Sequence, residues 1–185
     1  MPRAEGMVMH RIVLSLVLSL AVALVPHGTA AHSTQQHATG KLPTRGVLVV
    51  SKSLGGVSLG QTQARVKALW GGRYQLCEKS PCSDPTWLYF YPSGEPVGAA
   101  VRFRKNKAVA VFTLGATPGW KSVEGLKIAD PASKVYELYG NPKYSKCIGF
   151  EALSMQRNGV VTSFYLTSGV IYGFALTIPG LTVCQ

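Results

Sequence analysis

Side chains that do chemistry in enzymes are sparse in the part of this chain that we expect to fold, residues 46–185. That part contains no histidine, so neither a Ser-His-Asp nor a Cys-His arrangement can be assembled from it. It also lacks a phosphate-binding loop and a dinucleotide-binding fingerprint. Its seven acids show no pair at the short spacing that would suggest general acid–base catalysis: Glu78, Asp84, Glu95, Glu124, Asp130, Glu137 and Glu151. We therefore predict a protein that is not an enzyme and needs no cofactor. Because acids distant in sequence can meet in space, an uncharacterised hydrolase stays as an alternative.

The four cysteines allow three disulfide pairings. Cys77 and Cys82 bracket a short polar loop that contains Pro81, which favours a local bridge and leaves Cys147 to pair with Cys184. A metal site is the alternative. The cysteines lack the paired C-x-x-C type of spacing found in zinc sites, and no histidine of the folded part can complete a ligand set. We predict two disulfides and no metal.

Aromatic and arginine residues alternate with apolar residues in two predicted strands, residues 86–91 and 97–104. Successive side chains of a strand point to opposite faces, so each strand presents an apolar set and a second, amphipathic set. If the apolar sets lie under a helix, the amphipathic residues share the open face of the sheet. They are Trp87, Tyr89, Tyr91, Arg102 and Arg104.

Tyr, Trp and Arg dominate the energetics of protein interfaces, which makes this open face a candidate binding site. The structural alternative is that the tyrosines fill a half-buried strand and that the arginines discourage pairing at a sheet edge. The two readings differ in whether Trp87 and Tyr89 are exposed.

The N-terminus resembles a cleaved secretory signal. His10 and Arg11 precede an apolar run over residues 12–25, and small residues follow at 28–31. The run is shorter than the roughly 20 apolar residues of a membrane span. We predict a signal peptide over residues 1–31 and a flexible leader over 32–45. The mature protein is then soluble and without a membrane span, and it is secreted or lies in the periplasm or cell envelope.

The predicted mature chain is basic. Seventeen Lys and Arg (19 less Arg3 and Arg11) face seven acids (8 less Glu5), which gives a net charge of +10. Such a balance favours acidic partners or anionic surfaces. Export and the lack of a recognisable motif argue against nucleic acid as the partner.

An internal repeat organises the folded part. Residues 56–71 recur without a gap as residues 125–140, an offset of 69, with both flanking glycines retained. Each copy has a predicted helix cap, Thr62 in the first and Asp130 in the second, followed by an apolar stripe and a glycine stop.

Three predicted strands follow each helix: residues 86–91, 97–104 and 107–114, then 150–155, 160–166 and 170–178. Tight turns between them, such as Asn158-Gly159, indicate antiparallel meanders. We predict an α+β fold of two tandem units, residues 46–118 and 119–185. Each unit is one helix plus a three-stranded antiparallel meander, and together they form a curved sheet with the helices on one face.

The stretch over residues 53–71 resembles a motif, G-[IV]-x-L-G-M-T-x-x-x-V-x-x-x-x-G, of small secreted and envelope proteins. These proteins share a fold with β-lactamase inhibitory protein and with the small lipoprotein of the outer-membrane assembly machinery. Gln61 replaces the usual Met. The resemblance implies helix-plus-sheet units and a concave protein-binding surface. No residue carries over the contacts of the inhibitor.

These observations predict an exported, non-enzymatic protein that binds a protein or an anionic envelope component through an open sheet face lined by Tyr, Trp and Arg. The alternatives are a structural envelope protein and the hydrolase considered above.

Overall fold

A computed structural model describes residues 45–80, 82–89, 98–115 and 119–184. The predicted signal peptide and residues 32–44 of the predicted leader lie outside the described residues, whereas Arg45, the last residue of that leader, begins a strand. Within the described part, eleven strands and two helices follow one another along the chain. No helix of that part has the length and apolar character needed to cross a membrane.

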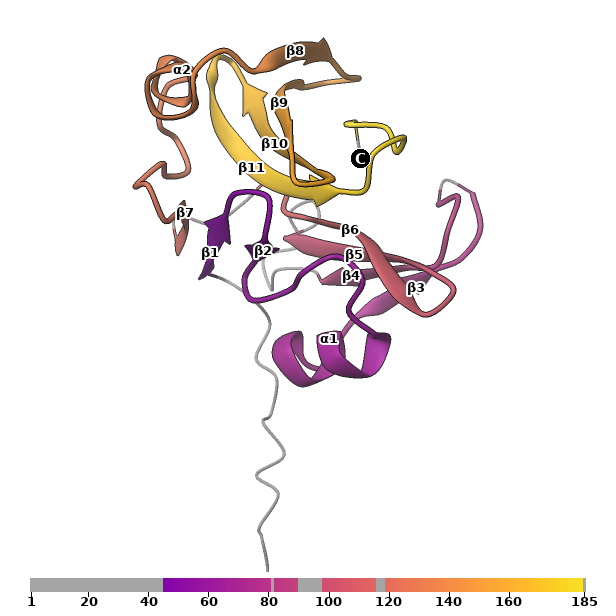
Figure 1. The fold of residues 1–185 in the computed structure, drawn as a ribbon. Coiled ribbons are helices and arrows are strands. Elements are labelled where there is room, and N and C mark those ends of the chain that lie inside the picture. The colour runs from indigo at the N-terminus through magenta and orange to yellow at the C-terminus, as the bar shows by residue number, and fades with distance from the viewer. Residues whose placement is uncertain (1–44, 81, 90–97, 116–118, 185) are drawn as a thin grey trace, which may run out of the picture. The chain divides into compact units, whose positions relative to one another are not determined.

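Eight of the strands form one antiparallel sheet (Figure 1). In spatial order they are β3 (Gln75–Cys77), β4 (Thr86–Tyr89), β5 (Ala99–Arg104), β6 (Lys107–Phe112), β11 (Val170–Thr177), β10 (Val160–Thr167), β9 (Glu151–Arg157) and β8 (Lys143–Lys146). The two meanders join where β6 pairs with β11, with Phe112 opposite Ala175 and Ala110 opposite Thr177. Gly173 permits the close approach there, because a Cβ atom on it would collide with the carbonyl oxygen of Thr113.

A second sheet contains the short strands β2 (Ser53–Leu54), β1 (Arg45–Val49) and β7 (Gly119–Ser122), in that order. β1 and β7 are parallel and place Gly46 opposite Trp120. The indole of Trp120 is fully buried, and a Cβ atom on Gly46 would lie 2.5 Å from it. A second glycine, Gly55, lies against the same ring. The absence of side chains at these two positions therefore creates the space for Trp120.

The helices are α1 (Gln63–Trp70) and α2 (Ser133–Tyr139). Thr62 caps α1, as predicted, and its Oγ1 accepts a hydrogen bond of 3.3 Å from the backbone N–H of Arg65. The predicted cap of the second helix is wrong, because α2 begins after Ala132 and has no side-chain cap. Asp130 instead accepts a hydrogen bond from the N–H of Lys127, and its carbonyl oxygen accepts one from Ile171 of β11. The pairing with β11 thus holds Asp130 outside the helix.

The predicted fold class, two helix-plus-three-strand units, is also wrong. The described residues form mainly β-strands, and one eight-stranded sheet contains strands from both predicted units. Each predicted meander gains a fourth, polar strand, β3 in one case and β8 in the other. The N-terminal strand β1 pairs with β2 and β7 in the separate small sheet.

Two loops that are 69 residues apart hold the same conformation. Gly60 donates to the carbonyl oxygen of Ala108 at the start of β6, and Ala129 donates to that of Ile171 at the start of β11. Both residues have positive φ, +82° at Gly60 and +70° at Ala129. Alanine adopts this left-handed region at a cost, whereas glycine does not.

We expect Ala129→Gly to raise the free energy of unfolding by about 0.5–1 kcal/mol, because it removes backbone strain. The matched variant is Gly60→Ala, whose added Cβ atom would meet nothing within 4 Å, so that strain alone should lower stability by a similar amount. Urea denaturation measures both. Destabilisation by Ala129→Gly would contradict the strain assigned to this loop.

Candidate functional site

The predicted aromatic site lies on a covered face of the eight-stranded sheet. Trp87 is 5% exposed and Tyr89 is fully buried, so the expectation that they lie on an open face is wrong. Tyr91 lies outside the described residues. Both described aromatics belong to the main core, on the side of the sheet that α1 and α2 cover.

Neighbouring aromatic rings explain this burial. Trp87 stacks on Tyr74 at a centroid distance of 3.9 Å and contacts Phe103, while Tyr89 lies edge-on to Trp70 of α1. The hydroxyl of Tyr89 donates a hydrogen bond of 3.3 Å to the carbonyl oxygen of Gly71, just after α1. Burial also raises the pKa of the Tyr89 phenol. The polar hydroxyl of Tyr89, which suggested an exposed residue, therefore finds its hydrogen-bond partner inside the protein.

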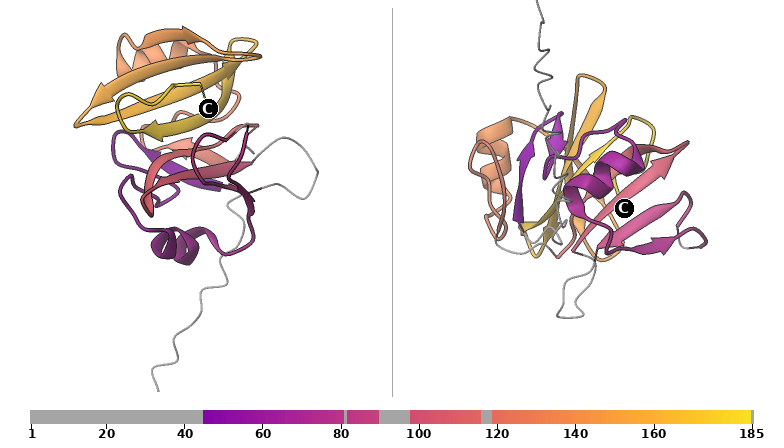
Figure 2. Two further views of the ribbon diagram at one scale, coloured as in Figure 1. Left: turned by 90° about the vertical axis from the view of Figure 1, so that its right-hand side faces the viewer. Right: turned by 90° about the horizontal axis from the view of Figure 1, so that it is seen from below.

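Neither helix of the described part of the chain covers the opposite face of the eight-stranded sheet, and we call it the helix-free face. Its centre consists of small side chains with two aromatics among them: Ala100, Ala110, Phe112, Ala152, Tyr165 and Ala175. The expectation of an open face is wrong here as well, because Leu181 and Val183 of the C-terminal segment pack against this cluster. Figure 2 (left) shows the C-terminal segment lying in front of the strands, with α2 behind them.

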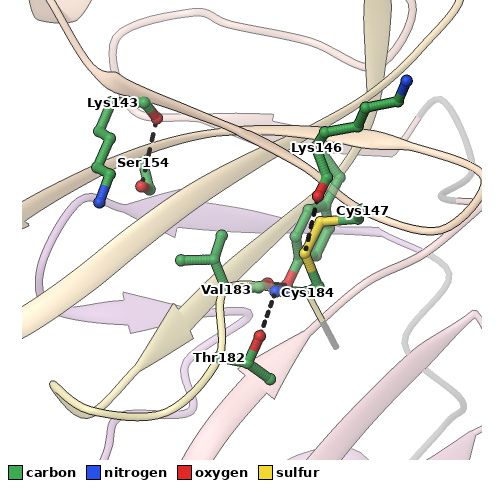
Figure 3. Close-up of a disulfide and its surroundings, with 8 residues drawn as sticks. Lys143, Lys146, Cys147, Ser154, Thr182, Val183 and Cys184 are labelled. Atoms are coloured by element: carbon green, nitrogen blue, oxygen red, sulfur yellow. Dashed lines mark hydrogen bonds between the residues drawn. A yellow bond between two sulfur atoms is a disulfide. The ribbon is translucent and has the colours of Figure 1, made fainter.

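Two bonds fix that segment. The hydroxyl of Tyr165 donates a 2.8 Å hydrogen bond to the carbonyl oxygen of Val183, and Cys184 forms a disulfide with Cys147 (Figure 3). The Cα atoms of this pair are 5.5 Å apart, and those of Cys77 and Cys82 are 5.9 Å apart. Both predicted disulfides are confirmed. No cluster of His, Cys, Asp or Glu that could hold a metal occurs among the described residues.

Arg102 lies on the helix-free face. The strand register places it between Thr86 of β4 and Ala110 of β6, and Ala110 in turn pairs with Thr177 of β11. The residue is half-buried, and its Nε atom is buried and has no hydrogen-bond partner among the described residues. A buried donor without a partner costs about 1–3 kcal/mol, and more when the group is charged, so Arg102 is a candidate to meet an external acceptor.

Two buried hydroxyl groups of the same face also lack partners. They are Thr177 Oγ1 and Ser163 Oγ, and both residues are fully buried. Ser163 lies opposite Ala175 of β11 and Ser154 of β9. The described part of the helix-free face therefore combines a centre of small side chains with three polar atoms that lack hydrogen-bond partners. Sequence periodicity alone does not reveal these three atoms.

Arg104, the other predicted arginine, already has a partner. Its Nη2 and Nε donate to the two carboxylate oxygens of Asp84 at 2.8 and 3.3 Å. The hydrogen bond from Arg104 holds the pKa of Asp84 below its usual value, and the charge of Arg102 adds to this. Arg104 thus forms the ion pair with Asp84, and Arg102 forms no ion pair within the described part of the chain.

A chain of polar side chains joins β7 to α2 elsewhere in the molecule. The Tyr139 hydroxyl lies 2.6 Å from Ser122 Oγ and 2.9 Å from a carboxylate oxygen of Glu124. Burial raises the pKa of Tyr139. Ser122 Oγ also accepts a hydrogen bond from the N–H of Leu126. Because Ser122 is buried and its partners are all internal, the arrangement fastens the end of α2 to β7 and offers no exposed nucleophile.

No family model matches this chain, and no curated protein matches it. Among solved structures, it is similar to a DUF4309 family protein, YjgB, from Bacillus subtilis. The two are 12% identical with a TM-score of 0.50, and the match covers 68% of this chain and 84% of YjgB. This likeness shows a shared fold only.

Two further structures are more distant. The uncharacterized protein YfeY from Escherichia coli has a TM-score of 0.46 at 12% identity, over 72% of this chain and 99% of its own. A cysteine-rich secretory protein from Staphylococcus aureus has a TM-score of 0.44 at 10% identity, over 65% of this chain and 44% of its own.

Proposed function

We propose that this chain is an exported, non-catalytic binding protein that holds an acidic segment of another protein against the helix-free face, with Arg102 as the central donor. The observation that carries the proposal is the buried, unpartnered Nε of Arg102. A guanidinium group presents a planar fork of donors that matches a carboxylate at two points.

Charge supports an acidic partner. The full chain has a formal net charge of +11, and Arg104 occupies the Asp84 carboxylate beside Arg102. Within the described residues, an approaching carboxylate therefore meets a positive group whose binding breaks no ion pair.

The unpartnered hydroxyl groups support an extended segment. Thr177 lies two strands from Arg102, with only the methyl group of Ala110 between them in the register. Because Thr177 is fully buried, a partner backbone that runs past Arg102 would reach Thr177 Oγ1 only after the atoms that cover it move, and it would then satisfy a buried polar group. The C-terminal segment would have to share the face with this partner or move from it.

Three observations support export. The apolar run over residues 12–25 with its basic start is typical of a secretory signal, and two disulfides are compatible with an oxidising location such as the periplasm or the cell exterior. The motif around Gly60, which resembles that of small secreted and envelope proteins, supports the same assignment.

The matching backbone hydrogen bonds of Gly60 and Ala129 support an internal duplication.

We expect Arg102→Gln to weaken the binding of a fluorescein-labelled peptide that alternates glutamate and threonine by at least about tenfold, because a charge-assisted hydrogen bond is lost. Arg102→Lys should lose part of this affinity, since it keeps the charge but not the two-point geometry. Fluorescence anisotropy at two salt concentrations measures both.

The control is Arg65→Gln, which removes one positive charge from α1 on the other side of the sheet. Equal weakening by Arg65→Gln and Arg102→Gln would mean that net charge alone attracts the peptide. An unchanged affinity in Arg102→Gln would reject the site. If the wild-type protein captures no acidic peptide, a structural envelope role becomes the better explanation.

A further inference from the structure

The turn between β8 and β9 carries an aliphatic side chain that the fold leaves in solvent. Ile148, in the turn between β8 and β9, is 99% exposed, whereas the branched aliphatic residues of the core are almost completely buried. Full exposure of an isoleucine forgoes the stabilisation that burial of such a side chain provides. A partner surface that buries the Ile148 side chain would recover this stabilisation.

The turn that presents Ile148 is held in place on both sides. Cys147, directly before it, is tied to Cys184, and the N–H of Cys147 donates a 2.9 Å hydrogen bond to the carbonyl oxygen of Phe150. Ile148 is therefore presented in a fixed position, and a binding partner does not have to order the turn.

Cationic and phenolic side chains lie along β8, which leads into this turn, with Lys146 next to the turn and Lys143 at the far end of the strand. Lys143 and Lys146 are exposed and extend from β8 in different directions, as Figure 3 shows. Tyr144, between them, is 51% exposed, and its hydroxyl donates a 3.0 Å hydrogen bond to Glu151. Glu151, the acid of β9 at this edge, is half-buried and engaged in that bond.

We propose that this edge, which we call the β8 tip (Lys143, Tyr144, Lys146 and Ile148), rests on the surface of a bilayer that contains anionic phospholipids. Ile148 enters the boundary between headgroups and acyl chains, Tyr144 lies at the headgroup level, and the two lysines contact the phosphates. The β8 tip thus combines an apolar group, an aromatic residue and cations, the three kinds of side chain that a membrane interface favours.

A bilayer fits the β8 tip better than a protein partner does. Protein hot spots are centred on Trp, Tyr or Arg in closely fitting pockets, and they are surrounded by contacts that exclude water. The β8 tip has instead one protruding aliphatic group with lysines on both sides, and lysines are depleted in protein interfaces. The edge is thus suited to a soft, negatively charged surface and to weak, salt-sensitive attachment.

Co-sedimentation with vesicles tests the proposal. We expect the protein to bind phosphatidylcholine vesicles that contain about one third phosphatidylglycerol, and to bind pure phosphatidylcholine much less. Ile148→Ser should lower the partition coefficient by about tenfold. Lys143→Gln and Lys146→Gln should each lower it about fivefold, and added salt should remove their effect.

Leu76→Ser is the matched control, because Leu76 is an exposed aliphatic residue on β3, the opposite edge of the same sheet. All variants carry the same residues 1–44, so any contribution of that segment cancels. Arg102→Gln should leave vesicle binding unchanged, which separates this proposal from the acidic-peptide site. Thermal melting of Ile148→Ser should match the parent, since the residue has no packing to lose.

Three results would overturn the proposal. The first is equal binding of Ile148→Ser and the parent to anionic vesicles. The second is equal loss of binding in Leu76→Ser. The third is an absence of vesicle binding together with concentration-dependent self-association that Ile148→Ser removes, which would assign the β8 tip to a protein interface.

Discussion

Replacing Trp120 with alanine should lower the free energy of unfolding by about 3–5 kcal/mol. The ring is fully buried and packs edge-on to Trp70 at a centroid distance of 6.2 Å. It also fills the space that Gly46 and Gly55 leave. The alanine variant would open a cavity bounded by β1, β2 and α1, and their backbones cannot all collapse into it. Chemical denaturation of the parent and the variant measures the loss.

The control is Val123→Ala, an apolar truncation just after β7 at a side chain that is 63% exposed, which should cost little. Trp120→Phe should fall between the two, because it retains part of the ring volume. If Trp120→Ala cost no more than Val123→Ala, the small sheet would not be part of the core on which the large sheet depends.

Removing the Cys147–Cys184 bridge should cost about 3–4 kcal/mol, and removing Cys77–Cys82 only about 2 kcal/mol. The bridges span 37 and 5 residues of chain, and a longer closed loop restricts the unfolded chain more. The first also holds Leu181 and Val183 on the helix-free face. Each cysteine pair is replaced by serines, and stability is measured without reductant.

The two serine variants serve as controls for each other. Equal losses would show that loop length is not the governing factor, and a larger loss from the Cys77–Cys82 pair would contradict the assignment. After removal of the longer bridge, proteolysis should begin within the C-terminal segment, since its covalent attachment to Cys147 is then lost and noncovalent contacts such as the Tyr165–Val183 hydrogen bond must hold it.

Elements with local signals could be predicted from the sequence. Asn158 and Gly159 both adopt positive φ, as the two-residue hairpin signal requires, and β9, β10 and β11 fall within a few residues of their predicted bounds. The Thr62 cap and the disulfides were likewise predictable, because each depends on residues that are close in sequence or that leave few alternatives.

The orientation of β4 was not predictable from its alternation. Leu88 on one side is half-buried and Trp87 on the other is buried, so both faces of this strand are covered and the pattern does not identify the helix side. Aromatic side chains bury the largest areas, which favours their placement in the main core. Arg102 and Arg104 differ in role because Asp84 pairs with only one of them, a distinction that requires the fold.

The edge strands β3 and β8 were missed for a different reason. Their residues are polar or exposed, and β propensity depends on cross-strand neighbours that a single sequence does not reveal. Asp130 was mistaken for a helix cap because its pairing with β11 is a tertiary contact.

The central pairing of β6 with β11 has a consequence for the order and rate of folding. Each meander forms from strands joined by short turns, whereas Thr113 and Phe174, which hydrogen-bond at the junction, are 61 residues apart, and Ser51 and Thr162 are 111 apart. Closing loops of this length lowers the chain entropy before the native contacts that offset this loss have formed. We therefore expect the hairpins to appear early and the junction to be the slow step, during which the unpaired edges of β6 and β11 are open to the same strand of another molecule.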